Sequence, residues 1–314
     1  MTEILNESHL LFPNYHPEIQ KIESQLLKNS GYHLAMLRED RIHTTVSGNK
    51  FRKLKYNLLR ASETGRQKLL TFGGAFSNHI AAVAAAGKEF GFETIGVIRG
   101  EELEAGVSRN TTLNFAQQQG MVLHFVSRED YRKKEMPVFI DGLKNLFGDF
   151  YLLPEGGTNT LAVQGCEEML TPETVTFDYL CVPVGTGGTI SGLVKASEEH
   201  QTVIGFSALK GNFQTSEVEK HCVRSNFRIT DDYCFGGYAK IDSGLVRFIN
   251  DFKNTHGIPL DPVYTGKMMY GIMEMVKNKE FKENSRILAV HTGGLQGIHG
   301  MNELLKRKNL PQIE

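Results

Sequence analysis

Four cationic residues that follow a Gly-Asn pair are the first candidates for a chemical role. The stretch TVSGNKFRKLKYN, residues 45–57, contains Lys50, Arg52, Lys53 and Lys55. This cluster could be a solvated basic patch, a grip on phosphate or the setting of one reactive lysine. A free lysine has a pKa of roughly 10.4 and is almost fully protonated at neutral pH. A nucleophilic lysine therefore needs surroundings that lower its pKa.

A second candidate site is the segment VPVGTGGTISG, residues 182–192, where a strand leads through a turn into a helix. The turn combines residues without side chains and residues with hydroxyls: Gly185, Thr186, Gly187, Gly188 and Thr189. Bare backbone N–H groups and a helix beginning near Thr189 favour a bound anion. A Walker loop would end in Lys-Ser/Thr, and Ile190 occupies the place of the third glycine of a dinucleotide fingerprint. The pattern therefore predicts a lone phosphate on a small cofactor.

A third set of polar residues opens an alanine-rich helix in TFGGAFSNHIAAVAAAGKEFG, residues 71–91. Ser77 or Asn78 is expected to cap this helix, since both residue types accept backbone N–H bonds at helix starts. Capping needs only one of them, however. Because Ser77, Asn78 and His79 follow a bare glycine pair, they also suit a site for a carboxylate or a ring oxygen.

Two further segments place polar residues at element ends. Tyr264 lies in LDPVYTGKMMYG, residues 260–271, and Thr292 lies where the strand of ILAVHTGGLQG, residues 287–297, meets its turn. A lone histidine such as His291 is more often a satisfied strand-end residue than a catalytic one.

The elements that must position these residues alternate between strand and helix. Short apolar runs predict buried strands at 68–72, 94–98, 121–126, 179–184, 202–208 and 286–291. Helical patterns lie at 79–91, 108–120 and 189–200. This alternation predicts an α/β fold with parallel sheets, two open lobes and a cleft between them. Ligands of such folds bind in loops at the carboxyl ends of strands, where the polar segments occur.

Composition excludes several classes of protein. The 314 residues carry 35 basic and 36 acidic side chains, for a net charge of −1, so we expect no nucleic acid or anionic membrane as partner. No apolar run approaches a membrane span, and the N-terminus lacks the pattern of a signal peptide. The four cysteines show no CxxC spacing, which argues against a metal site or disulfides. We expect reduced thiols in a cytoplasmic protein.

Taken together, these segments resemble the pyridoxal-phosphate enzymes of the tryptophan-synthase-β fold, also called fold type II. The resemblance is closest to the branch of 1-aminocyclopropane-1-carboxylate deaminases and D-cysteine desulfhydrases. That branch carries GNKxRKL, a GGxxSNH-type segment, a glycine/threonine phosphate loop, DPVYTGK and HTGG. The matching residues here are 48–54, 73–79, 185–189, 261–267 and 291–294. Each motif alone is weak, but all five in family order make a specific match.

The resemblance implies a cofactor, pyridoxal 5′-phosphate, whose phosphate would lie in the loop at 185–189. It also implies that Lys50 holds this cofactor covalently and then moves the Cα proton of the substrate. Lys50 stands at a helix start beside Arg52 and Lys53, where positive potential disfavours its ammonium form. Lys53 and Lys55 are then expected to be solvated or structural.

The resemblance gives roles to the other candidate residues as well. Asn78 would contact the hydroxyl of the cofactor ring, and Thr292 would meet its pyridine nitrogen. Ser77 and His79 would receive the substrate carboxylate, and Ser77 would also hold or relay a proton. Tyr264 would line the substrate pocket beside the ring.

The implied architecture is a two-lobed homodimer subunit. Residues 1–53 and 158–314 would form the larger, cofactor-binding domain, and residues 54–157 would form a smaller α/β domain that closes over the cleft. The change from one domain to the next is placed near PEGGTNT, residues 154–160, where two glycines follow a proline.

The implied reaction is α-proton removal and β-elimination on a small amino acid, with D-cysteine giving pyruvate, sulfide and ammonia. The first alternative is 1-aminocyclopropane-1-carboxylate deaminase. Those deaminases place a tyrosine just before their HxGG segment, where this chain has Ala289 and Val290. The segment FGGYAK, residues 235–240, also departs from the family's glycine–tyrosine–glycine pattern, which leaves room for another amino acid. A β-replacement synthase and a non-catalytic phosphate- or nucleotide-binding protein are the remaining alternatives.

Overall fold

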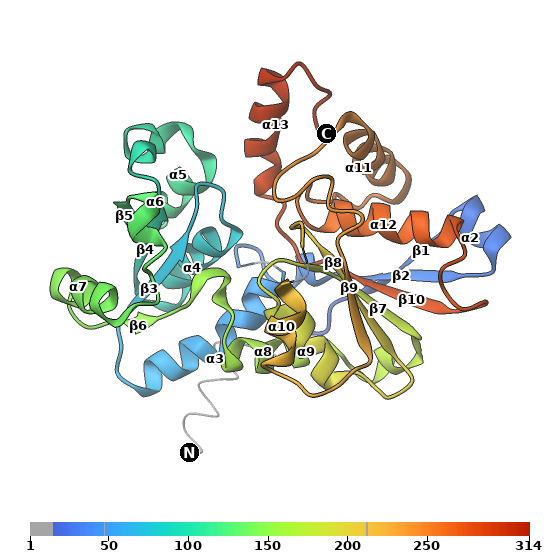
Figure 1. Ribbon diagram of the computed structural model, residues 1–314, viewed down its shortest axis with the longest axis horizontal. Coiled ribbons are helices and arrows are strands. Elements are labelled where there is room, and N and C mark those ends of the chain that lie inside the picture. The colour runs from blue at the N-terminus through green and yellow to red at the C-terminus, as the bar shows by residue number, and fades with distance from the viewer. Residues whose placement is uncertain (1–14, 47, 212) are drawn as a thin grey trace.

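The computed structural model describes residues 15–46, 48–211 and 213–314. Within them the chain forms two sheets, a larger one of order β1-β2-β10-β7-β8-β9 and a smaller one of order β5-β4-β3-β6. Figure 1 shows the two sheets in separate halves of the molecule, each with helices packed beside it. The expectation of no signal peptide rests largely on residues 1–14, which lie outside the described chain.

The strands are short, and β3, β4, β5, β7, β8 and β10 lie where the apolar runs predict them. The larger sheet contains β1 (Ile19–Ile22), β2 (His33–Leu37), β7 (Tyr179–Val184), β8 (Thr202–Ser207), β9 (Phe227–Thr230) and β10 (Arg286–Val290). The smaller sheet contains β3 (Lys68–Gly73), β4 (Glu93–Arg99), β5 (Val122–Val126) and β6 (Tyr151–Leu152). Every pairing is parallel except that of β1 with β2. The predicted α/β fold with parallel sheets is confirmed.

The helices connect these strands and cover the sheets. They are α2 (Gln25–Ser30), α3 (Asn49–Glu63), α4 (Asn78–Phe90), α5 (Thr111–Gln118), α6 (Arg128–Tyr131), α7 (Pro137–Phe147), α8 (Thr160–Glu167), α9 (Gly188–Ala196), α10 (Phe213–Glu219), α11 (Ser243–His256), α12 (Thr265–Lys277) and α13 (Gly297–Arg307). Among the described residues, no helix combines the length and the apolar character that crossing a bilayer requires.

Helix α4 shows how local sequence sets an element that borders the cleft. The Ser77 side chain accepts a hydrogen bond from the Ile80 N–H at 3.3 Å, so Ser77 is the N-cap and Asn78 is the first helical residue. Gly91 ends the helix in the left-handed conformation. The alanines between them are buried, so the helix packs closely on its sheet.

Two predictions about strands need correction. The strand at 121–126 is only partly buried, because β5 is the edge of its sheet: Val122 is 54% exposed, whereas Met121 and Val126 are buried. Strands β1, β2, β6 and β9 were not predicted. Three of them are only two to four residues long, and IQKI and FRIT mix charged with apolar residues, so they give no continuous apolar run.

The division into two domains stays a prediction. Helix α3 runs without a break across the expected boundary between residues 53 and 54.

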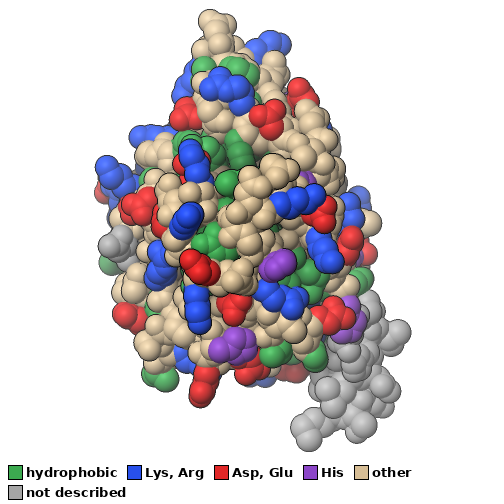
Figure 2. Space-filling view, turned by 90° about the vertical axis from the view of Figure 1, so that its right-hand side faces the viewer, with side chains coloured by type: hydrophobic (Ala, Val, Ile, Leu, Met, Phe, Trp, Pro, Cys, Tyr) green, Lys and Arg blue, Asp and Glu red, His purple; other side chains and the backbone are tan. Residues whose placement is uncertain are grey.

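Basic and acidic side chains are interspersed over the face drawn in Figure 2, in keeping with the net charge of −1.

Candidate active site

A cavity of about 850 Å³ lies between the two sheets. Its walls come from the loops that follow β3, β7 and β10 and from the first turn of α3. Each of these strands pairs in parallel with its neighbours in its own sheet, and the carboxyl ends of parallel strands are the expected place for a ligand site in an α/β fold. The volume is within the range of pockets for small ligands.

Most of the predicted site residues face this one cavity although they come from five segments of the chain. The cavity is lined by Lys50, Ser77, Asn78, His79, Gly185, Thr186, Gly187, Thr189, Tyr264 and Thr292. Gly188 does not line it. It lies behind the loop, where an added Cβ would come within 2.8 Å of Thr158 Oγ1 and 3.1 Å of Lys53 Nζ.

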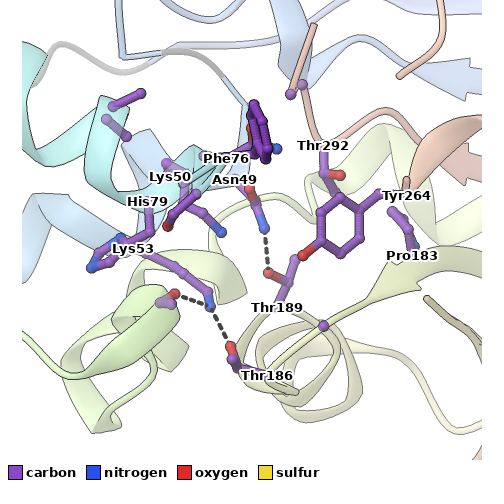
Figure 3. A pocket seen from close by; sticks show the side chains of 18 of the residues that line it. Asn49, Lys50, Lys53, Phe76, His79, Pro183, Thr186, Thr189, Tyr264 and Thr292 are labelled. Carbon is purple, nitrogen blue, oxygen red and sulfur yellow. Dashed lines mark hydrogen bonds between the residues drawn. The ribbon is translucent and has the colours of Figure 1, made fainter. Parts of the chain in front are cut away.

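The glycine loop leaves no room for side chains. Gly187 has φ +86°, and a Cβ on Gly185 would lie 3.2 Å from the ring of Tyr264. The Thr189 hydroxyl accepts a hydrogen bond from the Asn49 side chain at 2.8 Å, which ties the loop to α3 (Figure 3). The positive end of α9 and two hydroxyls therefore face the cavity, an arrangement that fits a phosphate group.

Lys53 belongs to this loop region, so of the two alternatives expected for it, solvated or structural, the solvated one is wrong. The side chain is only 2% exposed, and its Nζ donates to Gly156 O and Thr158 Oγ1, both at 3.0 Å. A longer contact of 3.5 Å reaches Thr186 Oγ1. A buried ammonium thus stands beside the predicted phosphate loop. Within the described chain it has no carboxylate partner at ion-pair distance.

Lys50 presents an amine to the cavity from the first turn of α3 (Figure 3). No hydrogen bond or ion pair involves its Nζ among the residues the structure describes. Burial, and to a smaller extent the nearby Lys53 ammonium, lower the pKa of Lys50 to about 7. A substantial fraction is then a free amine at neutral pH, as nucleophilic catalysis requires.

The cause of this low pKa differs in part from the expected one. Arg52 does not contribute, because its guanidinium makes two hydrogen bonds to the Glu39 carboxylate, at 2.9 and 3.1 Å. Both side chains are buried, and this ion pair neutralises the charge that the sequence placed beside Lys50. Desolvation, rather than the row of cations, is the main reason for a reactive lysine.

The polar residues at the start of α4 line the same cavity. Asn78 accepts a hydrogen bond from Gln296 at 3.0 Å, which joins the smaller sheet's half to the loop after β10. His79 is 2% exposed, and neither ring nitrogen has a hydrogen-bond partner in the described chain. Burial and then the charges of Lys50 and Lys53 hold the pKa of His79 well below its usual range. The imidazole is therefore neutral and can offer a single N–H donor.

Tyr264 and Thr292 complete the wall opposite α4. The Asp261 carboxylate accepts the backbone N–H groups of Val263, Tyr264 and Thr265 at 2.7–2.9 Å, and so fixes the turn that carries Tyr264. Thr292 is positioned through its backbone, because its carbonyl accepts the Asn49 N–H at 3.2 Å.

Gly48 makes this close approach of α3 to Thr292 possible, and we expect Gly48→Ala to be severely destabilising. The residue has φ +67° and ψ −154°, a region open almost only to glycine, and an added Cβ would lie 2.0 Å from Thr292 O. Gly65→Ala is the matched control, since Gly65 has φ +66° and open space around it. Strain alone should cost the control about 1–2 kcal/mol. Urea unfolding should show a clearly larger loss for Gly48→Ala, and equal losses would contradict the role of the contact.

A partly buried lysine amine that faces a glycine-rich anion loop defines a site for a phosphate-bearing cofactor that a lysine can hold covalently. The comparison with known families agrees, since residues 22–293 match the family described as "Pyridoxal-phosphate dependent enzyme". The chain belongs to this family of enzymes, and its cofactor is pyridoxal 5′-phosphate. The alternative of a non-catalytic phosphate-binding protein is thereby set aside.

Individual relatives are similar over nearly the whole chain. A putative 1-aminocyclopropane-1-carboxylate deaminase of Thermotoga maritima is 32% identical over 90% of this chain and 95% of its own length. A bifunctional mitochondrial D-cysteine desulfhydrase/1-aminocyclopropane-1-carboxylate deaminase of Arabidopsis thaliana is 29% identical over 86% of this chain and 74% of its own. The crystal structure of an ACC deaminase homologue superposes with a TM-score of 0.79 at 27% identity, covering 98% of this chain and 99% of the other. The predicted fold-type-II resemblance is confirmed.

Proposed function

We propose that this enzyme is a lyase that removes the Cα proton of a small amino acid and eliminates its β substituent, with D-cysteine as the first candidate substrate. The observation that carries the proposal is the free amine of Lys50 in a cavity whose far side holds an anion loop. The D-cysteine desulfhydrase activity in the name of the Arabidopsis relative supports the substrate.

The described residues fit the cofactor. The loop at 185–189, Lys53 and the positive end of α9 would hold the phosphate, and Lys50 Nζ would form the covalent link. Asn78 would contact the ring hydroxyl and Thr292 the pyridine nitrogen. When bound, pyridoxal phosphate stabilises negative charge at the Cα of the substrate. A neutral hydroxyl at the pyridine nitrogen moderates this effect, which suits elimination better than transamination.

The remaining residues would position the substrate and move its proton. The Ser77 hydroxyl and the neutral His79 N–H are the donors for the carboxylate. Ser77 would also hold or relay a proton, and Tyr264 would close the pocket beside the ring. Once its amine is released, Lys50 would accept the Cα proton, because a pKa of about 7 makes it an effective base at neutral pH.

The substrate assignment is tested by giving the purified holoenzyme D-cysteine and 1-aminocyclopropane-1-carboxylate separately. We expect sulfide and pyruvate from D-cysteine and no 2-oxobutanoate from the ring amino acid, because Ala289 and Val290 stand where the deaminases carry a tyrosine. Product from the ring compound alone would favour the deaminase. Turnover of D-cysteine only with an added nucleophile would favour β-replacement, and turnover of neither would contradict both assignments.

We also infer that residues 54–157 form a smaller domain that closes over the cleft on a larger domain of residues 1–53 and 158–314. The hydrogen bond from Gln296 to Asn78 is one contact that such closure would use. The expectation of a cytoplasmic homodimer that takes a small amino acid and no nucleic acid rests on the family resemblance, the near-neutral charge and four free cysteines.

A further inference from the structure

Tyr238 is a second phenol in the cavity wall that the sequence motifs do not assign. It lies in the loop between β9 and α11, and it lines the cavity together with Tyr264. The two rings meet edge to face, with centroids 6.2 Å apart and an interplanar angle of 68°. Two phenols thus converge on the side of the cavity opposite Lys50.

Tyr238 lines the cavity although it is 45% exposed. Burial raises the pKa of its hydroxyl, and the adjacent Tyr264 hydroxyl partly offsets the increase. Burial and then Tyr238 itself raise the pKa of Tyr264. The two rings are in contact, and both hydroxyls are neutral donors at physiological pH.

The loop that carries Tyr238 has a conformation unfavourable to its residues. Phe235 and Ala239 have φ +53° and +55°, and Gly236 and Gly237 also have positive φ. Ala239 stands where the resembled family has a glycine, so this chain keeps a left-handed backbone without the residue that makes it easy. Strained backbone persists where its surroundings fix it, often at ligand sites.

Lys267 holds this loop in place. Its side chain is 2% exposed, and its Nζ donates to Cys234 O at 2.8 Å and to Gly237 O at 2.7 Å. No carboxylate lies within ion-pair distance of this ammonium in the described chain. Lys267 follows Tyr264 by three residues in the first turn of α12. The DPVYTGK segment thus places one phenol directly and holds the loop of the other.

We propose that Tyr238 is a specificity-determining residue that contacts the β substituent of the substrate as one of a pair of phenols with Tyr264, and that Lys267 is its positioning residue. The inference rests on the proposed function for the identity of the substrate. The chemistry that two neutral hydroxyls recognise is a polar β substituent, such as a thiol or hydroxyl, rather than a methyl group or a ring methylene.

The reaction assigns a definite task to this pair. Lys50 accepts the Cα proton, the Cα–H electrons form the Cα–Cβ double bond, and the Cβ–S bond breaks with its electron pair on sulfur. The departing hydrosulfide is an anion in a partly buried site, and the Tyr238 hydroxyl stabilises it by donating a hydrogen bond. A weakly basic leaving group such as chloride needs this donor less.

The first test compares Tyr238→Phe with the unaltered enzyme on D-cysteine and β-chloro-D-alanine. Loss of one hydrogen bond should lower kcat/KM for D-cysteine roughly tenfold, mainly in kcat, and should leave β-chloro-D-alanine nearly unchanged. Equal losses on both substrates, or no loss on either, would overturn the proposal.

The second test measures binding from the initial change in cofactor absorbance on rapid mixing, before product from D-serine accumulates, which separates this inference from the proposed function. D-serine and D-alanine differ by one hydroxyl, and their affinities can be read from the absorbance of the bound cofactor. Tyr238→Phe should weaken D-serine by roughly tenfold and D-alanine little. This result would support the contact even if D-cysteine were not turned over. An unchanged ratio of affinities would overturn it even if D-cysteine were a good substrate, and binding of neither amino acid would count against both.

The role of Lys267 is tested in the same assay. Lys267→Met should reduce the preference for D-serine as Tyr238→Phe does, and the double variant should lose no more than either single variant. Lys277→Met is the control, because Lys277 ends the same helix and is exposed. If Lys267→Met lowers stability but keeps the D-serine preference, Lys267 is structural only. The Tyr238→Phe results still decide the role of the phenol, because the exposed ring should tolerate that change.

Discussion

Lys50→Ala should leave a folded protein that neither holds pyridoxal phosphate covalently nor turns over its substrate. The amine has two tasks in the proposed mechanism, the covalent link and the movement of the Cα proton. General acid–base catalysis alone contributes about 10²–10⁴-fold, so the loss of kcat should reach at least the upper end of this range. Sulfide release from D-cysteine measures the loss, and the visible absorbance of the protein reports the covalent link.

Borohydride reduction of the holoenzyme, followed by identification of the lysine that carries the reduced cofactor, tests which lysine of the cluster forms the covalent link. Lys50 should carry the reduced cofactor, and its presence on Lys53 would contradict this assignment. Lys55→Ala is a matched control on the same helix. Its Nζ contacts the Glu168 carboxylate at 2.8 Å, outside the cavity, so the variant should keep its colour and its activity.

The sequence predicts well where local pattern and function coincide. The run YLCVPV is β7 over its full length, and the glycines after it adopt the bare turn that the pattern requires. Ser77 caps α4 by accepting the Ile80 N–H, and such a cap can be predicted because both residues lie within one turn. The family motifs place ten predicted residues around one cavity. Such features depend on neighbouring residues, or on motifs that occur in the same order as in the family.

The rest depends on contacts between distant segments. Lys53 resembles a surface lysine until Gly156 and Thr158, more than 100 residues away, accept hydrogen bonds from its amine. Arg52 resembles a source of positive potential until Glu39 pairs with it. Tyr238 enters the site only through the loop held by Lys267. No periodicity or spacing contains these pairings, since each depends on how the two halves of the chain pack.

Lys53→Met should weaken the binding of pyridoxal phosphate by about 10- to 100-fold, because a charge-assisted hydrogen bond to a phosphate contributes about 1.5–3 kcal/mol. The same change should raise the pKa of Lys50, since the Lys53 ammonium is one cause of its low value of about 7. At pH 7 a smaller fraction of Lys50 would then be a free amine. The pH midpoint for labelling of Lys50 by an amine-directed reagent in the apoprotein should therefore move upward.

The change in cofactor affinity and the change in the pKa of Lys50 are measured separately. Together they show whether Lys53 binds the phosphate or only stabilises the fold. Titration of the apoprotein with pyridoxal phosphate gives the affinity, and inorganic phosphate should compete less well in Lys53→Met than in the unaltered protein. Lys55→Met makes the same substitution two residues away and should change neither quantity. If Lys53→Met lowered thermal stability while cofactor affinity and phosphate competition stayed the same, Lys53 would only hold the carbonyl of Gly156. A buried ammonium beside an anion loop, with no carboxylate partner in the described chain, favours the first result, because a phosphate would neutralise a charge that burial makes costly.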